Sequence, residues 1–231
     1  MSTEPDISGT ELIQGKALTA LVRKPQPAQG PHPVLVMIHG WGAKESDIYE
    51  LVPFVDKRVL IVAPRGPSLA SDDPRGSFKW YERTEPGHPD EASIGYSTEK
   101  LGALLDELGE LGQVEIDPSQ IYIGGFSQGG VMALQMAATY PERLAGVISH
   151  SGFMSPSAAE RLRAGVFKGK SAFVAHGTLD IVLRPNFSQQ IKEILKEGGV
   201  DVTFHEYPIG HATSIESRQD LGNWLNPRLR F

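Results

Sequence analysis

The 231-residue sequence contains no cysteine. Without thiols the chain has no disulfide framework, no thiolate nucleophile and no zinc site built from thiolates. It also lacks a long hydrophobic run, since the longest, residues 34–38, falls far short of the roughly 20 apolar residues of a membrane-spanning helix. The N-terminus is polar and acidic and has neither the basic nor the apolar region of a signal peptide. We therefore expect a cytoplasmic protein without a transmembrane segment.

Positive charge is scarce as well, because 22 Lys and Arg stand against 28 Asp and Glu, which gives a net charge of −6. A nucleic-acid partner would require a basic patch, so we expect none. The length and an apolar content of 40% suit one domain spanning residues 1–231, with residues 1–9 as a loose tail. No internal repeat or linker-like composition divides the chain.

Strand-like and helix-like segments alternate along the chain. Residues 34–38 are apolar without alternation, as expected of a strand buried on both faces. Such alternation favours the α/β class, with a mostly parallel central sheet and helices on both faces. We predict strands within residues 12–23 and at 34–38, 59–63, 121–123, 144–148, 172–175 and 201–207, and helices at 46–55, 97–111, 131–138, 157–164, 185–197 and 214–225.

Gly125-Phe-Ser-Gln-Gly129 lies between a predicted strand and a predicted helix. It fits G-x-S-x-G, the nucleophile elbow, in which a sharp turn lifts the serine clear of the sheet. The glycines are needed because side chains two positions before and after the serine would collide at the turn. The alternative is a glycine-rich strand–helix turn that happens to contain Ser127.

A serine hydroxyl needs a base to accept its proton, and the base needs an orienting acid. In chains with a nucleophile elbow, the acid comes after the serine in the sequence, and the histidine comes after the acid. Asp180 follows a predicted strand, although a solvated turn aspartate is the alternative, and Asp201 begins a strand and should lie at the opposite edge. Of the later histidines, His211 lies in a loop after a strand, whereas His205 lies inside it. The predicted triad is therefore Ser127, His211 and Asp180.

Two backbone amides are expected to stabilise the oxyanion. One belongs to Gln128, directly after the nucleophile, and the other to Trp41 in the loop after the strand at 34–38. The Trp41 indole is also placed to form a wall of the acyl site. His39, His150 and His176 end strands and are expected to bond local backbone groups, because their spacing matches no metal motif. We predict no metal and no organic cofactor.

Residues 64–95 have no periodicity but contain Phe78, Trp80 and Tyr81. A connection this long inside a compact domain is usually functional or disordered, and the aromatic residues argue against disorder. We expect this long loop to lie over the active site. The predicted substrate pocket comprises Phe78, Trp80, Tyr81, Phe153 and Leu183.

Four motifs together resemble the phospholipase/carboxylesterase family of α/β-hydrolases, which includes acyl-protein thioesterases and small bacterial carboxylesterases. They are His39-Gly-Trp-Gly42, Gly125-Phe-Ser-Gln-Gly-Gly130, His176-Gly-Thr-Leu-Asp-Ile-Val182 and Gly210-His211. Trp80-Tyr81, followed by an acidic residue, is similar to a further segment of the family. The resemblance covers roughly residues 33–225 and implies an α/β-hydrolase fold, the same triad, and an oxyanion hole around Trp41 and Gln128.

The chain departs from the family at two places near the acyl pocket. Thioesterase members usually have Leu-Gly-Asp after His-Gly, where this chain has Trp41-Gly-Ala43, and the segment after Asp180 does not end in Val-Val-Pro. Both departures favour a small ester over a fatty-acylated protein. We predict a serine carboxylesterase for short-to-medium acyl esters. A lysophospholipase or acyl-protein thioesterase, a peptidase, and an inactive binding protein on the same scaffold are the alternatives, and a homodimer is compatible with the sequence.

Overall fold

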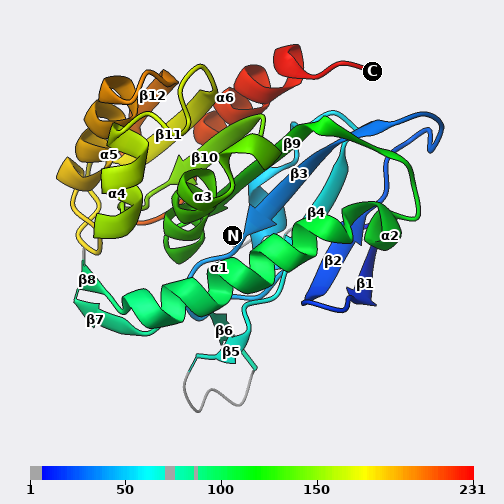
Figure 1. Ribbon diagram of the computed structural model, residues 1–231, viewed down its shortest axis with the longest axis horizontal. Coiled ribbons are helices and arrows are strands. Elements are labelled where there is room, and N and C mark those ends of the chain that lie inside the picture. Colours follow the sequence, from blue (N-terminus) through cyan, green and yellow to red (C-terminus); the bar gives the residue numbers. More distant parts are fainter. Residues whose placement is uncertain (1–6, 71–75, 86–87) are drawn as a thin grey trace.

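An eight-stranded sheet forms the centre of the computed structural model, which describes residues 7–70, 76–85 and 88–231 (Figure 1). Pairings β1–β2 and β2–β4 are antiparallel, and the others are parallel. The mostly parallel sheet is confirmed. In spatial order the strands are β1 (Thr10–Gln14), β2 (Thr19–Arg23), β4 (Leu60–Pro64), β3 (His32–Ile38), β9 (Ile116–Phe126), β10 (Gly146–His150), β11 (Ser171–Gly177) and β12 (Asp201–Tyr207).

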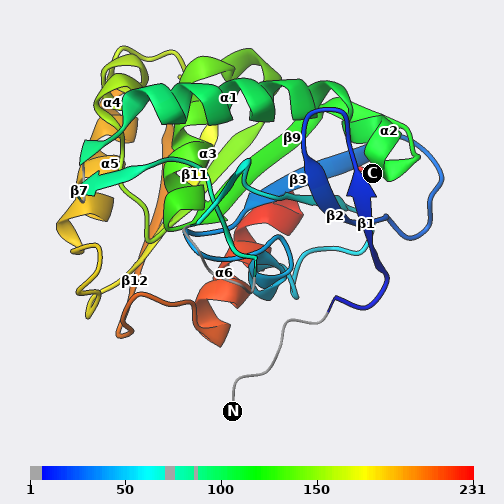
Figure 2. The ribbon, with the colours of Figure 1, turned by 90° about the horizontal axis from the view of Figure 1, so that it is seen from below.

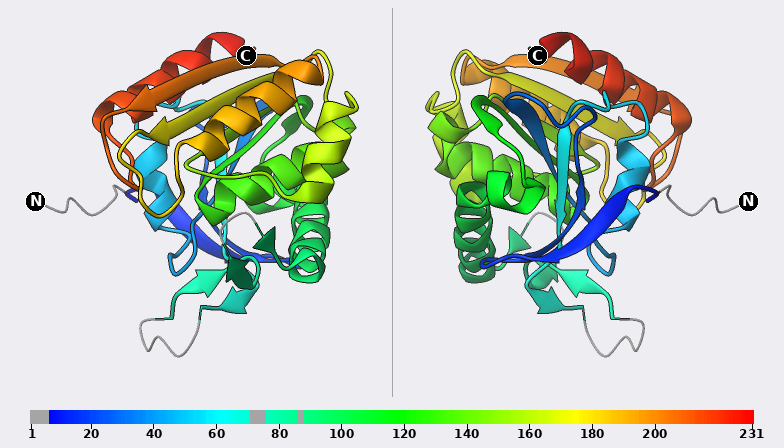
Figure 3. Two further views of the ribbon diagram at one scale, coloured as in Figure 1. Left: turned by 90° about the vertical axis from the view of Figure 1, so that its left-hand side faces the viewer. Right: turned by 90° about the vertical axis from the view of Figure 1, so that its right-hand side faces the viewer.

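Helices cover both faces of this sheet, as Figures 2 and 3 show. One face carries α1 (Glu91–Asp106), α2 (Leu108–Gly112), α3 (Gln128–Thr139), α4 (Pro156–Arg163) and α5 (Asn186–Glu197). The other carries the 3₁₀ helix η1 (Asp47–Leu51) and α6 (Ile215–Leu225). Two further 3₁₀ turns are η2 (Pro141–Arg143) and η3 (Asn226–Arg228).

Strand β3 shows why its sequence has no polar alternation. Val34, Val36 and Ile38 belong to the core under α1 and α3, whereas Leu35 and Met37 belong to the core under η1 and α6. Successive side chains of a strand point to opposite faces, and here both faces are covered by helices. Every residue of the strand is therefore buried.

Two predicted helices differ from the structure. The helix expected at 46–55 is only η1. Pro53 follows it closely, and a proline disfavours the α conformation of the residue before it. The helix expected at 97–111 begins earlier, at Glu91, where the side chain of Asp90 caps the Ser93 amide. It also breaks at Glu107, whose carboxylate accepts hydrogen bonds from the amides of Lys16 and Ala17 in the β1–β2 turn.

Residues 64–95 contain more regular structure than the sequence indicated. Two short antiparallel pairs form there, β5 (Ser68–Leu69) with β6 (Phe78–Lys79) and β7 (Arg83–Glu85) with β8 (His88–Pro89). Residues 71–75 and 86–87 of this stretch, like residues 1–6 of the predicted tail, lie outside the described residues.

The junction of β9 with α3 has no room for a side chain at Gly125 or at Gly129. A Cβ at Gly129 would lie 1.9 Å from the Ile38 carbonyl oxygen, and one at Gly125 would lie 2.5 Å from the same atom. Real Cβ atoms do not approach an oxygen so closely. The first turn of α3 therefore presses directly on the carboxyl end of β3.

Substitution Gly129→Ala should lower the free energy of unfolding by about 3 kcal/mol or more, because overpacking against backbone cannot relax by a side-chain rotation. Gly95→Ala is a matched control: a Cβ at Gly95, in helix α1, would meet nothing within 4 Å. Alanine there should stabilise by up to about 1 kcal/mol. Urea unfolding measures the change in the free energy of unfolding of each variant, which should be a loss for Gly129→Ala and a small gain for Gly95→Ala. Equal stability of the two variants would contradict this account of the junction.

Candidate active site

Ser127 occupies the turn between β9 and α3 with φ 54° and ψ −118°. A positive φ is uncommon for a residue with a side chain and is a strained conformation typical of functional turns. The turn is fixed on both sides, because the Ser127 amide donates to the carbonyl of His150 and its carbonyl accepts from Val131. The serine is partly exposed between two fully formed elements.

Three side chains from three strand ends form one hydrogen-bonded row. His211 Nε2 lies 2.9 Å from Ser127 Oγ, and His211 Nδ1 lies 2.6 Å from Asp180 Oδ2. Ser127 follows β9, Asp180 follows β11 and His211 follows β12. Parallel strands bring their carboxyl ends to one edge of the sheet, which explains the meeting of residues distant in sequence.

Asp180 is buried and its carboxylate is fully hydrogen-bonded. Oδ1 accepts from the amides of Val182 and Leu183, each at 2.9 Å. The Nε2 of His176 lies 2.8 Å from the Leu183 carbonyl oxygen and 3.4 Å from Asp180 Oδ2. A carbonyl oxygen only accepts, so the His176 proton is on Nε2, from where it also faces the carboxylate. These donors stabilise a negative charge that burial alone would disfavour.

The other nearby histidines are placed differently from His211. His150 is buried, and burial lowers its pKa to about 3, so it stays neutral next to the ring of Phe126. Phe126 also packs 4.9 Å from His211, ring centre to ring centre. His205 stacks on Tyr207 and lies 3.7 Å from Asp220. The structure thus brings His211, and not His205, to Ser127.

Gln128 and Trp41, the two residues predicted for the oxyanion, flank Ser127. Gln128 is the first residue of α3, and its buried side chain accepts from the Trp80 amide and donates to the Tyr81 carbonyl. Trp41 lies in the loop after β3, and its side chain is 44% exposed. The neighbouring Gly40 touches the elbow, since a Cβ there would lie 3.4 Å from Ser127 Cβ.

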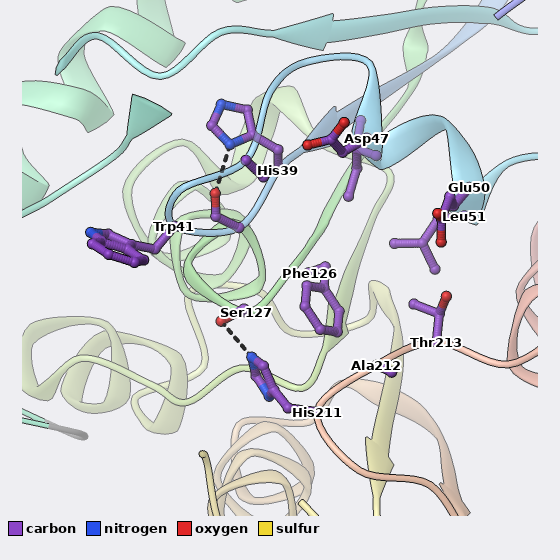
Figure 4. A pocket seen from close by; sticks show the side chains of 13 residues that line it. His39, Trp41, Asp47, Glu50, Leu51, Phe126, Ser127, His211, Ala212 and Thr213 are labelled. Atoms are coloured by element: carbon purple, nitrogen blue, oxygen red, sulfur yellow. Dashed lines mark hydrogen bonds between the residues drawn. The ribbon is translucent and has the colours of Figure 1, made fainter. Parts of the chain in front are cut away.

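A cavity of about 330 Å³ opens beside Ser127 (Figure 4). Its lining includes the apolar residues Ile48, Leu51 and Phe126. Two residues with carboxylates, Asp47 and Glu50, also line it. Glu50 pairs with Arg218 at 2.7 Å. The lining residues are His39, Gly40, Trp41, Ala43, Asp47, Ile48, Glu50, Leu51, Phe126, Ser127, His211, Ala212 and Thr213.

The five residues predicted for the substrate pocket are not among those that line this cavity. Trp80 and Tyr81 are 1% and 4% exposed and belong to the core under α1 and α3, as do the buried Phe153 and Leu183. Phe78 is half-buried and pairs with Ala43 in a short bridge, next to Trp41. Their assignment to a substrate pocket stays a prediction.

Several lining residues had no signal in the sequence. Asp47 and Glu50 come from η1 and Thr213 from the loop before α6, and none of the three lies directly after a strand or in residues 64–95. In the described part of the chain no group of three or more His, Asp or Glu is arranged to hold a metal ion. Within the same residues, no helix is long and apolar enough to cross a membrane.

Comparison with known proteins adds independent information. Residues 21–228 match the family model described as Phospholipase/Carboxylesterase. Acyl-protein thioesterase 1 of Neurospora crassa is 31% identical over 240 residues, which cover 92% of this chain and 95% of the relative. The protein of the same name from Emericella nidulans is 34% identical over 216 residues, which cover 83% and 88%.

Solved structures agree with this relationship. The carboxylesterase from Mesorhizobium loti matches with a TM-score of 0.79 at 19% identity, covering 95% of this chain and 99% of its own. The Bacillus cereus carboxylesterase matches with a TM-score of 0.78 at 25% identity, covering 93% and 96%. The expected α/β-hydrolase fold is confirmed. The chain therefore belongs to the phospholipase/carboxylesterase family of α/β-hydrolases, as an esterase or thioesterase.

Proposed function

We propose that the protein is a serine carboxylesterase that hydrolyses short-to-medium acyl esters through an acyl-enzyme. The observation that carries the proposal is the hydrogen-bonded row Ser127–His211–Asp180, placed at an elbow and open to a cavity. A hydroxyl, an imidazole and a buried carboxylate in this order are the parts required for acyl transfer.

Catalysis follows from the positions of these groups. Ser127 Oγ attacks the ester carbonyl while His211 Nε2 accepts its proton, and Asp180 keeps the remaining proton on Nδ1 and stabilises the imidazolium. The amides of Trp41 and Gln128 are proposed to donate to the oxyanion. His211 then returns the proton to the departing alcohol. Water, activated by His211, hydrolyses the acyl-enzyme and releases the acid.

The cavity supports a small substrate. Its volume of about 330 Å³ is at the lower end of the roughly 300–1,000 Å³ usual for ligand pockets, and Trp41 is one of its lining residues. Asp47 in the lining disfavours an anionic group there, since like charges repel at short range, whereas the charge of Glu50 is compensated by Arg218. A neutral, short acyl or alcohol group suits this environment best.

A lysophospholipase or acyl-protein thioesterase is the second candidate, because two relatives are named acyl-protein thioesterase 1 and the same triad would serve both reactions. A binding protein with an inactive site is disfavoured by the complete hydrogen-bonded row, which such a protein would not need.

Substitution Ser127→Ala should reduce kcat by about 10⁶-fold, leaving a residual of roughly 10³–10⁴-fold above the uncatalysed reaction from the oxyanion donors and binding. Hydrolysis of p-nitrophenyl butyrate and labelling by a fluorophosphonate measure the loss. Ser171→Ala, at the amino end of β11, is the control and should keep both the ester hydrolysis and the fluorophosphonate labelling. More than a few per cent of wild-type activity in the purified Ser127→Ala protein would exclude this nucleophile.

His211→Ala should remove the activity, because in the part of the chain that the structure describes no other side chain bonded to Ser127 Oγ can accept its proton. His205→Ala, a matched change in the preceding strand, should leave kcat within about twofold, since His205 contacts Tyr207 and Asp220 instead. The opposite pattern in the kcat values of the two variants would make His205 the base.

Acyl-chain preference should show a short optimum. Each added methylene gains up to about 0.8 kcal/mol, roughly fourfold in kcat/KM, while it fits, and beyond that length overpacking should make kcat/KM fall. Trp41→Leu should move the optimum to longer chains by removing indole volume from the cavity wall. A series of p-nitrophenyl esters from acetyl to palmitoyl tests this. A wild type that prefers palmitoyl over butyryl would favour the lysophospholipase or thioesterase candidate.

A further inference from the structure

His39 is fully buried at the carboxyl end of β3 and takes no part in the proton transfers described above. Both nitrogens of its ring have partners. Nδ1 lies 2.7 Å from the carbonyl oxygen of Gly40, and Nε2 lies 3.0 Å from the amide nitrogen of Gly66, which donates to it. The ring therefore connects the loop after β3 with the segment after β4.

These two partners determine the tautomer of His39. A backbone N–H can only donate, so Nε2 must be the unprotonated nitrogen that accepts from Gly66. The ring proton is then on Nδ1 and is donated to the Gly40 carbonyl. Burial lowers the pKa of His39, which keeps the ring neutral and preserves this arrangement at neutral pH.

The Gly40 carbonyl belongs to the same peptide unit as the Trp41 amide. Among the described residues only the Gln26–Pro27 bond is cis, so this unit is trans, and its C=O and N–H point in opposite directions. Figure 4 shows the His39 ring on one side of this loop and Ser127 on the other. Gly40 lies directly against Ser127, because a Cβ on it would be 3.4 Å from Ser127 Cβ.

We propose that His39 is a positioning residue for the oxyanion site: its Nδ1–H binds the Gly40 carbonyl on the side away from Ser127 and thereby directs the Trp41 N–H toward the developing oxyanion. This inference rests on the proposed esterase function. Rotation of this one peptide unit would place a carbonyl oxygen, an acceptor, where a donor is needed. The hydrogen bond from His39 opposes that rotation.

The preceding peptide unit is fixed as well. The indole Nε1 of Trp80 donates to the His39 carbonyl at 3.0 Å, and the Trp80 amide donates to the Gln128 side chain at 2.9 Å. Because the unit before Gly40 cannot turn freely, the orientation of the Gly40–Trp41 unit depends on the two hydrogen bonds to the Gly40 carbonyl, the 2.7 Å bond from His39 and a longer one of 3.3 Å from the Ala43 amide.

Two substitutions separate the two contacts of the ring. Asparagine carries an amide N–H at about the position of Nδ1, so His39→Asn keeps a donor for Gly40 and loses the contact with Gly66. Glutamine reaches about the position of Nε2, so His39→Gln keeps an acceptor for Gly66 and loses the donor for Gly40. Asn leaves a gap in a buried site and should be the less stable variant.

We expect His39→Gln to lower kcat by about 10²-fold with KM nearly unchanged, the size of effect seen when one oxyanion donor is lost. His39→Asn should retain kcat within about fivefold despite its lower Tm. Activity would then run opposite to stability. A purely structural role predicts instead that activity follows stability, so a more active Gln variant, or equal losses in both, would overturn the proposal.

Affinity for a trifluoromethyl ketone, which forms an oxyanion on Ser127, provides a second measurement. This affinity should fall in His39→Gln in parallel with kcat, while the KM for the ester does not change. An equal rise in the inhibition constant of the ketone and in the KM for the ester would contradict the proposal. If His39→Gln does not fold, His39→Met, of similar volume and without an N–H, replaces it. Failure of the esterase function would appear separately, as a wild-type protein that hydrolyses no p-nitrophenyl ester or as an active Ser127→Ala protein.

Discussion

The close approach of helix α3 to strand β3 is the constraint on which the rest of the site depends. The Ile38 carbonyl oxygen occupies space that any side chain at Gly125 or Gly129 would need, so the backbone of the elbow lies directly against the end of β3. Because β3 and β9 are hydrogen-bonded neighbours, the loop that follows β3 must pass beside the residue that follows β9. Ser127 and the Gly40–Trp41 peptide are therefore adjacent as a consequence of sheet order, before any side chain is considered. Strain at Ser127, with its φ of 54°, is tolerated because β9 is hydrogen-bonded to both β3 and β10 and because α3 packs directly on the end of β3.

Burial divides the titratable groups around this junction into two kinds. His39 and His150 are buried where desolvation lowers their pKa, so they act as neutral hydrogen-bonding groups. Asp180 is equally buried but has donors on both carboxylate oxygens, which compensate its charge. His211 differs from all of these, because its side chain is 17% exposed and it is one of the residues that line the cavity. An imidazole whose charge must change during a reaction needs this intermediate setting, since complete burial would oppose the imidazolium.

The sequence allowed the elbow, the three residues of the row and the sheet to be predicted because each depends on local spacing or on the ends of parallel strands. Cavity residues such as Asp47 and Thr213 could not be predicted, since they come from segments far apart in sequence that meet only after η1 and α6 pack on the same face. Asp90, the N-cap residue of α1, is a local sequence signal for the early start of this helix. The many prolines and glycines of residues 64–95 favour a loop and obscured that signal. Trp80 and Tyr81, two of the residues predicted for the substrate pocket, are buried in the core under α1 and α3.

Gln128 explains how the irregular stretch is connected to the elbow. Its amide side chain is buried, so both of its polar atoms need partners, and the stretch supplies one N–H from Trp80 and one carbonyl from Tyr81. A carboxylate could not donate to the second partner, and an apolar residue would leave both unsatisfied. With its amide bound in this way, Trp80 directs its indole to the carbonyl of His39. Trp80 thus holds both the residue after the serine and the residue that begins the 39–42 loop, and Tyr81 of the same segment adds a second hydrogen bond to the former. The relative position of Ser127 and Trp41 therefore depends on this segment as well as on the pairing of β3 with β9.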